Sequence, residues 1–190
     1  MTPEELIDAW NVEAEALRQF FGAQPMIPGW GRHHTEAFSK FKRAGMALQK
    51  FRTYEVDLAA RGIEHSDDIE PLGFYADAFY YFAWRFVRLL RLAKARRSDG
   101  LTYQPFRGFD SGGVRRARNQ MLEHTEKDDG VPDLQTLFFS PNGWVMASHV
   151  VDEHGMPIDP GLYPNAEQLI IGLRRRLAEA SAATRPGGGN

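Results

Sequence analysis

Apolar side chains recur at helical spacing near the start of the chain. The following residues, spaced by four, seven and four positions, fall on one side of a helix: Leu6, Trp10, Leu17 and Phe21. Thr2 can cap the first turn, Pro3 suits the first helical position, and Glu5 completes a capping box with Thr2. The pattern therefore predicts a helix that begins after Thr2 and ends near Gly22.

Two longer stretches also have a helical pattern. A helix is predicted over residues 35–61, ended by Gly62, with Gly45 at a place where another helix can approach closely. A second helix is predicted over residues 71–97. An apolar band about 100° wide runs along it, made of Tyr75, Phe79, Phe82, Phe86, Leu89, Leu90 and Ala93. The opposite side of this central helix is expected to carry Tyr80, Trp84, Arg88 and Arg91.

The second half of the chain has shorter elements. Gly112 and Gly113 predict a turn before a short basic helix over residues 114–124. Two runs of β-favouring residues, LQTLFF and WVMASHVV, flank SPNG, and the Asn-Gly pair predicts a β-hairpin over residues 134–151. A final amphipathic helix is predicted over residues 165–183.

These elements predict a fold that is mainly α, a helical bundle of four to five helices with a small C-terminal β-hairpin and a final helix. We expect one domain over residues 1–185, in which a bundle over residues 1–127 comes first. Residues 186–190, PGGGN, are expected to form a flexible tail.

Charge is unevenly distributed along the 190 residues. Residues 85–118 hold ten Lys or Arg and two Asp, whereas the rest of the chain holds 13 basic and 23 acidic residues. One interpretation is an anion-binding surface, and the other is a solvated helix face neutralised by acidic helices packed beside it. The aromatic and arginine residues of the central helix fit either nucleic-acid binding or a protein interface.

Several classes of protein and site are excluded or disfavoured. The chain has no cysteine, so it has no disulfide and no thiolate site, which suits the cytoplasm. No signal peptide or membrane-spanning run is visible, and no Gly-x-Ser-x-Gly elbow occurs. His33 and His34 are adjacent and are expected to be surface residues. His149 and His154 match no metal-site spacing that we recognise, so we predict no metal and no cofactor.

The segment RNQMLEH, from Arg118 to His124, resembles the motif of the HEPN superfamily. In that family an Arg followed by a polar residue, often Asn, precedes a His by four to six intervening positions. The resemblance implies a compact helical bundle, usually dimeric, and in many members a metal-independent endoribonuclease that acts as a toxin, in phage defence or in RNA processing. Other members are non-catalytic. The hairpin and the final helix depart from the minimal family pattern.

The resemblance, together with the residue chemistry, assigns candidate sites. Arg118 would stabilise the phosphorane charge, His124 would transfer a proton, and Asn119 would orient them. The candidate RNA-binding residues are Trp84, Arg88, Arg91, Arg115 and Arg116. Expected partners are RNA, a second copy of the chain in a homodimer and a protein such as an antitoxin, with no membrane. The alternative is a non-catalytic helical module that binds a protein, in which Arg118 pairs with Glu123 or an acidic helix and His124 helps to end its helix.

Overall fold

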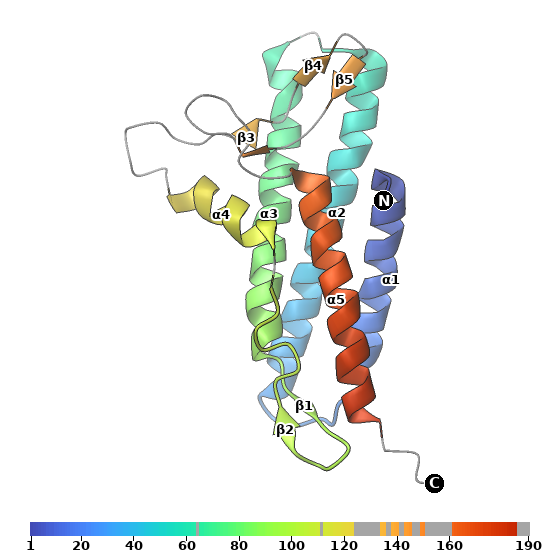
Figure 1. Ribbon diagram of the computed structural model, residues 1–190. Coiled ribbons are helices and arrows are strands. Elements are labelled where there is room, and N and C mark those ends of the chain that lie inside the picture. Colours follow the sequence, from blue (N-terminus) through green and yellow to red (C-terminus); the bar gives the residue numbers. More distant parts are fainter. Residues whose placement is uncertain are drawn as a thin grey trace.

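The computed structural model describes residues 1–63, 65–110, 112–123, 134–135, 138–140, 143–145, 149–150 and 161–185. Four long helices lie side by side, and a shorter one branches from the side of this bundle (Figure 1). The long helices are α1 (Pro3–Gly22), α2 (Trp30–Arg61), α3 (Glu70–Leu92) and α5 (Leu162–Thr184), and the shorter one is α4 (Gly113–Glu123). A single 3-10 turn, η1 (Ser66–Ile69), precedes α3. The prediction of a mainly α bundle is confirmed.

Short antiparallel strand pairs complete the described structure. Their strands are β1 (Ala95–Arg96), β2 (Thr102–Tyr103), β3 (Leu134–Gln135), β4 (Phe138–Ser140), β5 (Gly143–Val145) and β6 (His149–Val150). β4 pairs with β5, as the Asn-Gly prediction required, and β3 pairs with β6. β1, which falls inside the range predicted to be helical, pairs with β2.

The capping box predicted for α1 is present. The Glu5 amide donates to Thr2 Oγ1 at 3.2 Å, and the Thr2 amide donates to Glu5 Oε2 at 2.8 Å. These two bonds satisfy donors that the first turn of a helix otherwise leaves unpaired. The local sequence alone therefore fixes where α1 begins.

The indole of Trp10, a residue of α1, fills the space beside Gly45, where a close approach of another helix was predicted. Trp10 of α1 is buried, and a Cβ at Gly45 would lie 2.5 Å from its Cδ1. The indole stacks on Phe41 at 4.5 Å, and its Nε1 donates to the Phe41 carbonyl at 3.0 Å. Glycine is required at position 45 because any side chain there would occupy the space of the ring.

The structure differs from the prediction at the start of α2, at the end of α3 and on one side of α3. α2 begins at Trp30, whose side chain is buried, after Gly29 in a left-handed conformation (φ 86°). α3 ends at Leu92 and not at residue 97, because Ala95 and Arg96 pair with β2. Tyr80, expected on the exposed side of α3, is fully buried. No helix in the described part of the chain combines the length and the apolar character that a membrane span needs.

Candidate functional site

The site is built around the start of α4, where two glycines allow contact with α5. Gly112 has a positive φ of 54°, and a Cβ there would lie 2.9 Å from Gln168 Oε1. A Cβ at Gly113 would lie 1.8 Å from Asn165 Oδ1, which is an overlap of atoms. The Gly112 amide also donates to Asp110 Oδ1 at 3.2 Å. The predicted turn therefore serves to bring α4 directly against α5.

Asn165 connects this turn to the centre of the bundle. Its side chain is fully buried, and Nδ2 donates to the hydroxyl of Tyr80 at 3.0 Å. Tyr80 belongs to α3, so one amide links α3, α5 and the first residue of α4. A buried polar group is costly without a partner, which explains why a tyrosine lies here instead of a phenylalanine. The hydrophobic pattern alone gave no signal of this contact.

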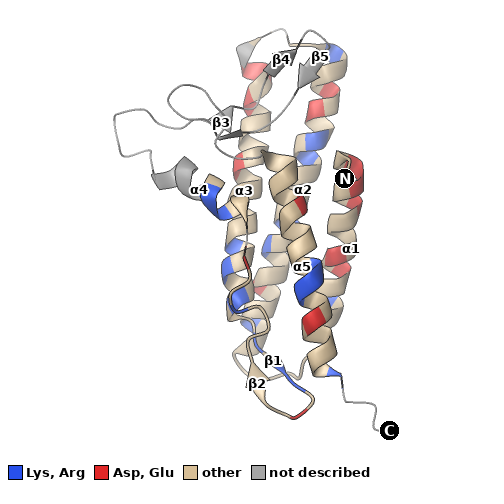
Figure 2. Cartoon of the chain, viewed as in Figure 1, with Lys and Arg blue, Asp and Glu red and all other residues tan. Residues whose placement is uncertain are grey.

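The helix α4 has one buried side and one charged side. Val114 and Ala117 are fully buried, and Arg115 and Arg116 are exposed. α4 therefore packs through its small apolar residues and presents Arg115 and Arg116 to solvent. The basic positions of this helix are blue in Figure 2.

Arg118, the arginine of the HEPN-like motif, lies over Trp84 of α3. Its guanidinium carbon is 4.1 Å from the centroid of the indole, and that of Arg88 is 4.8 Å from the same ring. Trp84 and Arg118 are half-buried and Arg88 is exposed. Attraction between a cation and the electron-rich face of the ring favours both positions. The structure thus brings together three of the predicted site residues, from two helices.

The other predicted catalytic residues are described only in part. Asn119 belongs to α4, but its side chain lies outside the described residues, and so does that of Glu123. His124 lies outside them entirely.

Arg91, a predicted RNA-binding residue, has a structural contact. Its Nε donates to the Phe109 carbonyl at 2.7 Å, and its Nη2 donates to the same oxygen at 2.5 Å. Phe109 is buried against α5, where its ring contacts Gly172. Arg91 therefore holds the segment that leads from β2 to α4. The sequence did not predict this role, because a carbonyl acceptor in a distant loop leaves no local pattern.

His34, expected at the surface, is buried. Its ring stacks on Phe21 at 4.3 Å, and Nε2 lies 2.9 Å from the Lys94 carbonyl, to which it donates. Burial lowers the pKa of His34 below its usual value of 6.5, although the bond to Lys94 opposes this shift. His34 is thus a neutral residue of the core. Within the described residues, no three His, Asp or Glu side chains are grouped so that they could hold a metal ion.

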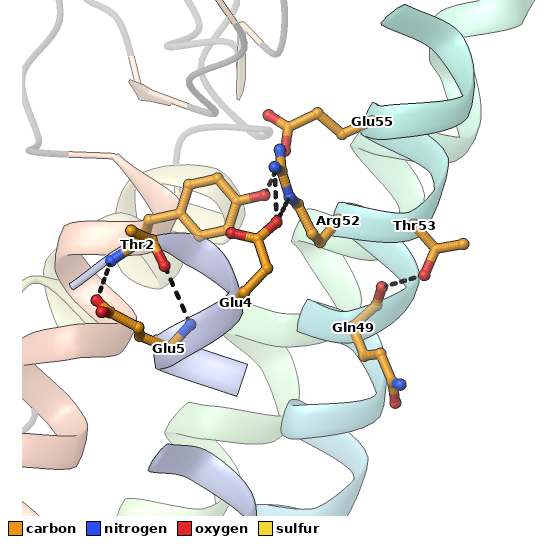
Figure 3. A network of polar contacts seen from close by, with 8 residues as sticks. Thr2, Glu4, Glu5, Gln49, Arg52, Thr53 and Glu55 are labelled. Atoms are coloured by element: carbon orange, nitrogen blue, oxygen red, sulfur yellow. Dashed lines mark hydrogen bonds and ion pairs between the residues drawn. The ribbon is translucent and has the colours of Figure 1, made fainter. Parts of the chain in front are cut away.

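A second polar cluster joins α1, α2 and α5 (Figure 3). Arg52 Nη1 donates to Glu55 Oε2 at 2.7 Å, and Arg52 Nε donates to Glu4 Oε1 at 2.8 Å. The hydroxyl of Tyr163 donates to Glu55 Oε2 at 2.6 Å. Burial, and then the bond to Glu55, raise the pKa of Tyr163. The arginine is neutralised by two carboxylates, so this cluster is structural.

Comparison with known proteins gives no relative for this chain. It has no significant match to a protein-family model, to a curated protein or to a solved structure.

Proposed function

We propose that this chain is a metal-independent endoribonuclease similar to those of the HEPN superfamily. The observation that carries the proposal is the position of Arg118. The motif arginine lies on Trp84 beside the exposed Arg88, and α4 adds two more exposed arginines. A guanidinium that stacks on an aromatic ring uses its face, whereas phosphate is recognised through its N–H edge. Stacking on Trp84 is therefore compatible with phosphate binding.

The proposed reaction is an internal transfer at phosphorus. The 2′-OH of the RNA attacks the adjacent phosphorus, a new P–O2′ bond forms, and the P–O5′ bond breaks. His124 exchanges a proton with the reacting oxygens, and Arg118 stabilises the negative charge that develops on the phosphorane. Asn119 orients these groups. The products are a 2′,3′-cyclic phosphate and a free 5′-OH, and no metal takes part.

The proposed active form is a homodimer. Residues six apart on a straight helix point about 120° away from each other. If the helix continued without a bend to His124, Arg118 and His124 of one chain would not face one phosphate, whereas an arginine and a histidine from two subunits can. Dimerisation at micromolar concentrations, measured by light scattering, is the expected result. We place such an enzyme in a toxin–antitoxin or phage-defence system in the cytoplasm, with RNA and an antitoxin as partners.

The test is cleavage of mixed RNA by the purified protein in EDTA. Arg118→Ala and His124→Ala are each expected to slow cleavage by about 10²–10⁴-fold, because each removes a group that acts in the transition state. Asn119→Ala should have a smaller effect. The matched control is Arg175→Ala, which removes an exposed arginine from α5. Mass spectrometry of the products should find the 2′,3′-cyclic phosphate.

The outcomes that contradict the proposal are clear. Wild-type protein without RNase activity would remove it, and so would full activity in the Arg118→Ala, His124→Ala double variant. If the double variant unfolds, these residues are structural. Thermal unfolding of each variant is therefore measured beside the activity.

The second candidate function is a non-catalytic module that binds a protein. The exposed aromatic residues of α3 favour it, because Phe74 is 69% exposed and Tyr81, seven positions later on the same side of the helix, is 48% exposed. Phe74→Ala tests this candidate. If the chain is such a module, the wild-type protein should cut no RNA, Phe74→Ala should abolish binding of its protein partner, and Arg118→Ala should leave that binding unchanged.

A further inference from the structure

Two stretches without acidic residues lie against each other in the bundle. Residues 37–54 of α2 contain five Lys or Arg and no Asp or Glu, and residues 78–98, which begin in α3, contain six Lys or Arg and no Asp or Glu. Phe41 of the first stretch packs on Phe86 of the second, with ring centroids 4.8 Å apart. The positive charge of this side of the molecule therefore extends beyond residues 85–118 and onto α2.

On the α2 side, the cations gather around Phe82 of α3. Lys40 Nζ is 5.5 Å from the centroid of the Phe82 ring, and the guanidinium carbon of Arg43 is 5.6 Å from it. Arg43 is exposed, and Lys40 and Phe82 are half-buried. This arrangement repeats that of Trp84, where two cations also lie over one ring on the α4 side.

Tyr81 lies between these two groups around α3. At 100° per residue, Tyr81 points about 60° away from Trp84 on one side and about 100° away from Phe82 on the other. Tyr81 is 48% exposed, and its ring meets that of Phe82 edge to face with the ring centroids 5.3 Å apart. Arg88, on the same outward side, continues the charge between the two groups. We call the whole set the cation–aromatic band: Lys40, Arg43, Tyr81, Phe82, Trp84, Arg88 and Arg118.

We propose that the cation–aromatic band binds an unpaired RNA strand that crosses from α4 over α3 to α2. Cations lie along the band from Arg118 through Arg88 to Lys40 and Arg43, and the exposed ring of Tyr81 lies among them. Cations follow the backbone and a base stacks on Tyr81, which is how proteins bind single strands without reading their sequence. Lys40 and Arg43 are thus RNA-binding residues more than 70 positions before the motif. The inference rests on the proposed function for the choice of RNA as the ligand.

The experiment measures binding of the full chain to a fluorescent 2′-O-methyl oligoribonucleotide, which has no free 2′-OH and is not cleaved. Lys40→Glu with Arg43→Glu should weaken binding at least ten-fold at ~0.1 M salt. It should also reduce the slope of log affinity against log salt by about 1.4, because each lost phosphate contact removes about 0.7. Tyr81→Ala should weaken binding about five-fold and leave the slope unchanged, because stacking releases no counterion.

Two controls separate the band from general charge and from misfolding. Arg175→Glu with Arg176→Glu makes the same change of charge on α5, and it should leave affinity nearly unchanged. Lys40→Gln with Arg43→Gln removes the two positive charges without introducing negative ones. It should cause at least half of the loss of RNA-binding free energy that the Lys40→Glu, Arg43→Glu variant shows. Circular dichroism and thermal unfolding of every variant check the fold.

The results distinguish this inference from the proposed nuclease activity. Uncleaved RNA that binds through Lys40 and Arg43 supports the band even if the chain cuts no RNA. Suppose that cleavage needs Arg118 but that Lys40→Glu with Arg43→Glu leaves RNA affinity unchanged. This result would contradict RNA binding by the cation–aromatic band and would still support the nuclease activity. Competition by polyglutamate as strong as that by RNA would also overturn it, since an acidic protein would then be the ligand.

Discussion

Two arginine clusters of this molecule use different partners. Around Arg52, the carboxylates of Glu4 and Glu55 accept its N–H groups, and Tyr163 completes the buried side. Around Trp84, Arg88 and Arg118 lie against the face of an indole. A carboxylate occupies the edge of a guanidinium that would otherwise bind phosphate, whereas a ring occupies its face. The described contacts therefore differ in kind: carboxylates bind the edge of the arginine in the first cluster, and an indole packs on the faces of the arginines in the second.

The largest expected difference between the clusters is in stability. Glu55→Ala should lower the free energy of unfolding by about 2–3 kcal/mol, because it leaves Arg52 partly buried with Glu4 as its remaining carboxylate partner. Arg88→Ala, which removes an exposed cation from the Trp84 ring, should lower it by less than about 1 kcal/mol, the usual value of a cation–aromatic contact near the surface. Urea denaturation of both variants measures the difference. Equal losses of stability would mean that the Trp84 cluster is structural too.

A second, smaller change in stability tests the contact between Gly113 of α4 and Asn165 of α5. Gly113→Ala should cost about 2 kcal/mol of stability, because the new methyl group would overlap Asn165. Asn165→Ala in the same chain should restore part of this loss, although on its own it should destabilise by removing a hydrogen bond to Tyr80. Gly73→Ala is the matched control, since nothing lies within 4 Å of a Cβ there, and it should stabilise α3 slightly. Additive losses at Gly113 and Asn165 would contradict the contact.

The smallest expected effect concerns His34, a titratable group that the fold keeps neutral. Its pKa is lowered in the folded chain, so below pH 6.5 the unfolded chain binds a proton that the folded chain does not. Stability should therefore decrease as the pH falls through 6.5, by less than about 1 kcal/mol between pH 7 and pH 6. His34→Gln should flatten this dependence, and His33→Gln, which leaves the buried ring in place, should not. A pH profile unchanged by His34→Gln would show that other groups govern it.

Local signals in the sequence predicted most of the helices. The capping box at Thr2, the end of α2 at Gly62, where φ is positive, and the Gly112–Gly113 turn depend on neighbouring residues alone, so they are readable from the sequence. The burial of Tyr80 is not readable in this way. α3 contacts α2, α4 and α5, so more of its circumference is buried than in a helix with a single apolar face. Because the hydroxyl of Tyr80 is polar, the hydrophobic pattern did not predict that this residue is buried.

The candidate site was only partly predictable for the same reason. A motif in the sequence pointed to Arg118, and the proximity of basic and aromatic residues pointed to Trp84 and Arg88. Lys40 and Arg43 were missed because they join Phe82 only through the packing of α2 on α3. The number of basic residues in one segment does not show which basic residues of different helices meet on one surface.

The contact between Gly113 and Asn165 also has a consequence for the order of events during synthesis. α4 packs against α5, which is the last helix of the described chain, and against α3. A ribosome delivers α4 before α5, and domains fold as their segments emerge. The motif helix therefore acquires its second packing partner only after residues 162–184 have been translated, so a nascent chain does not yet have the contact between Gly113 and Asn165. Assembly of the candidate site is timed to the completion of the bundle.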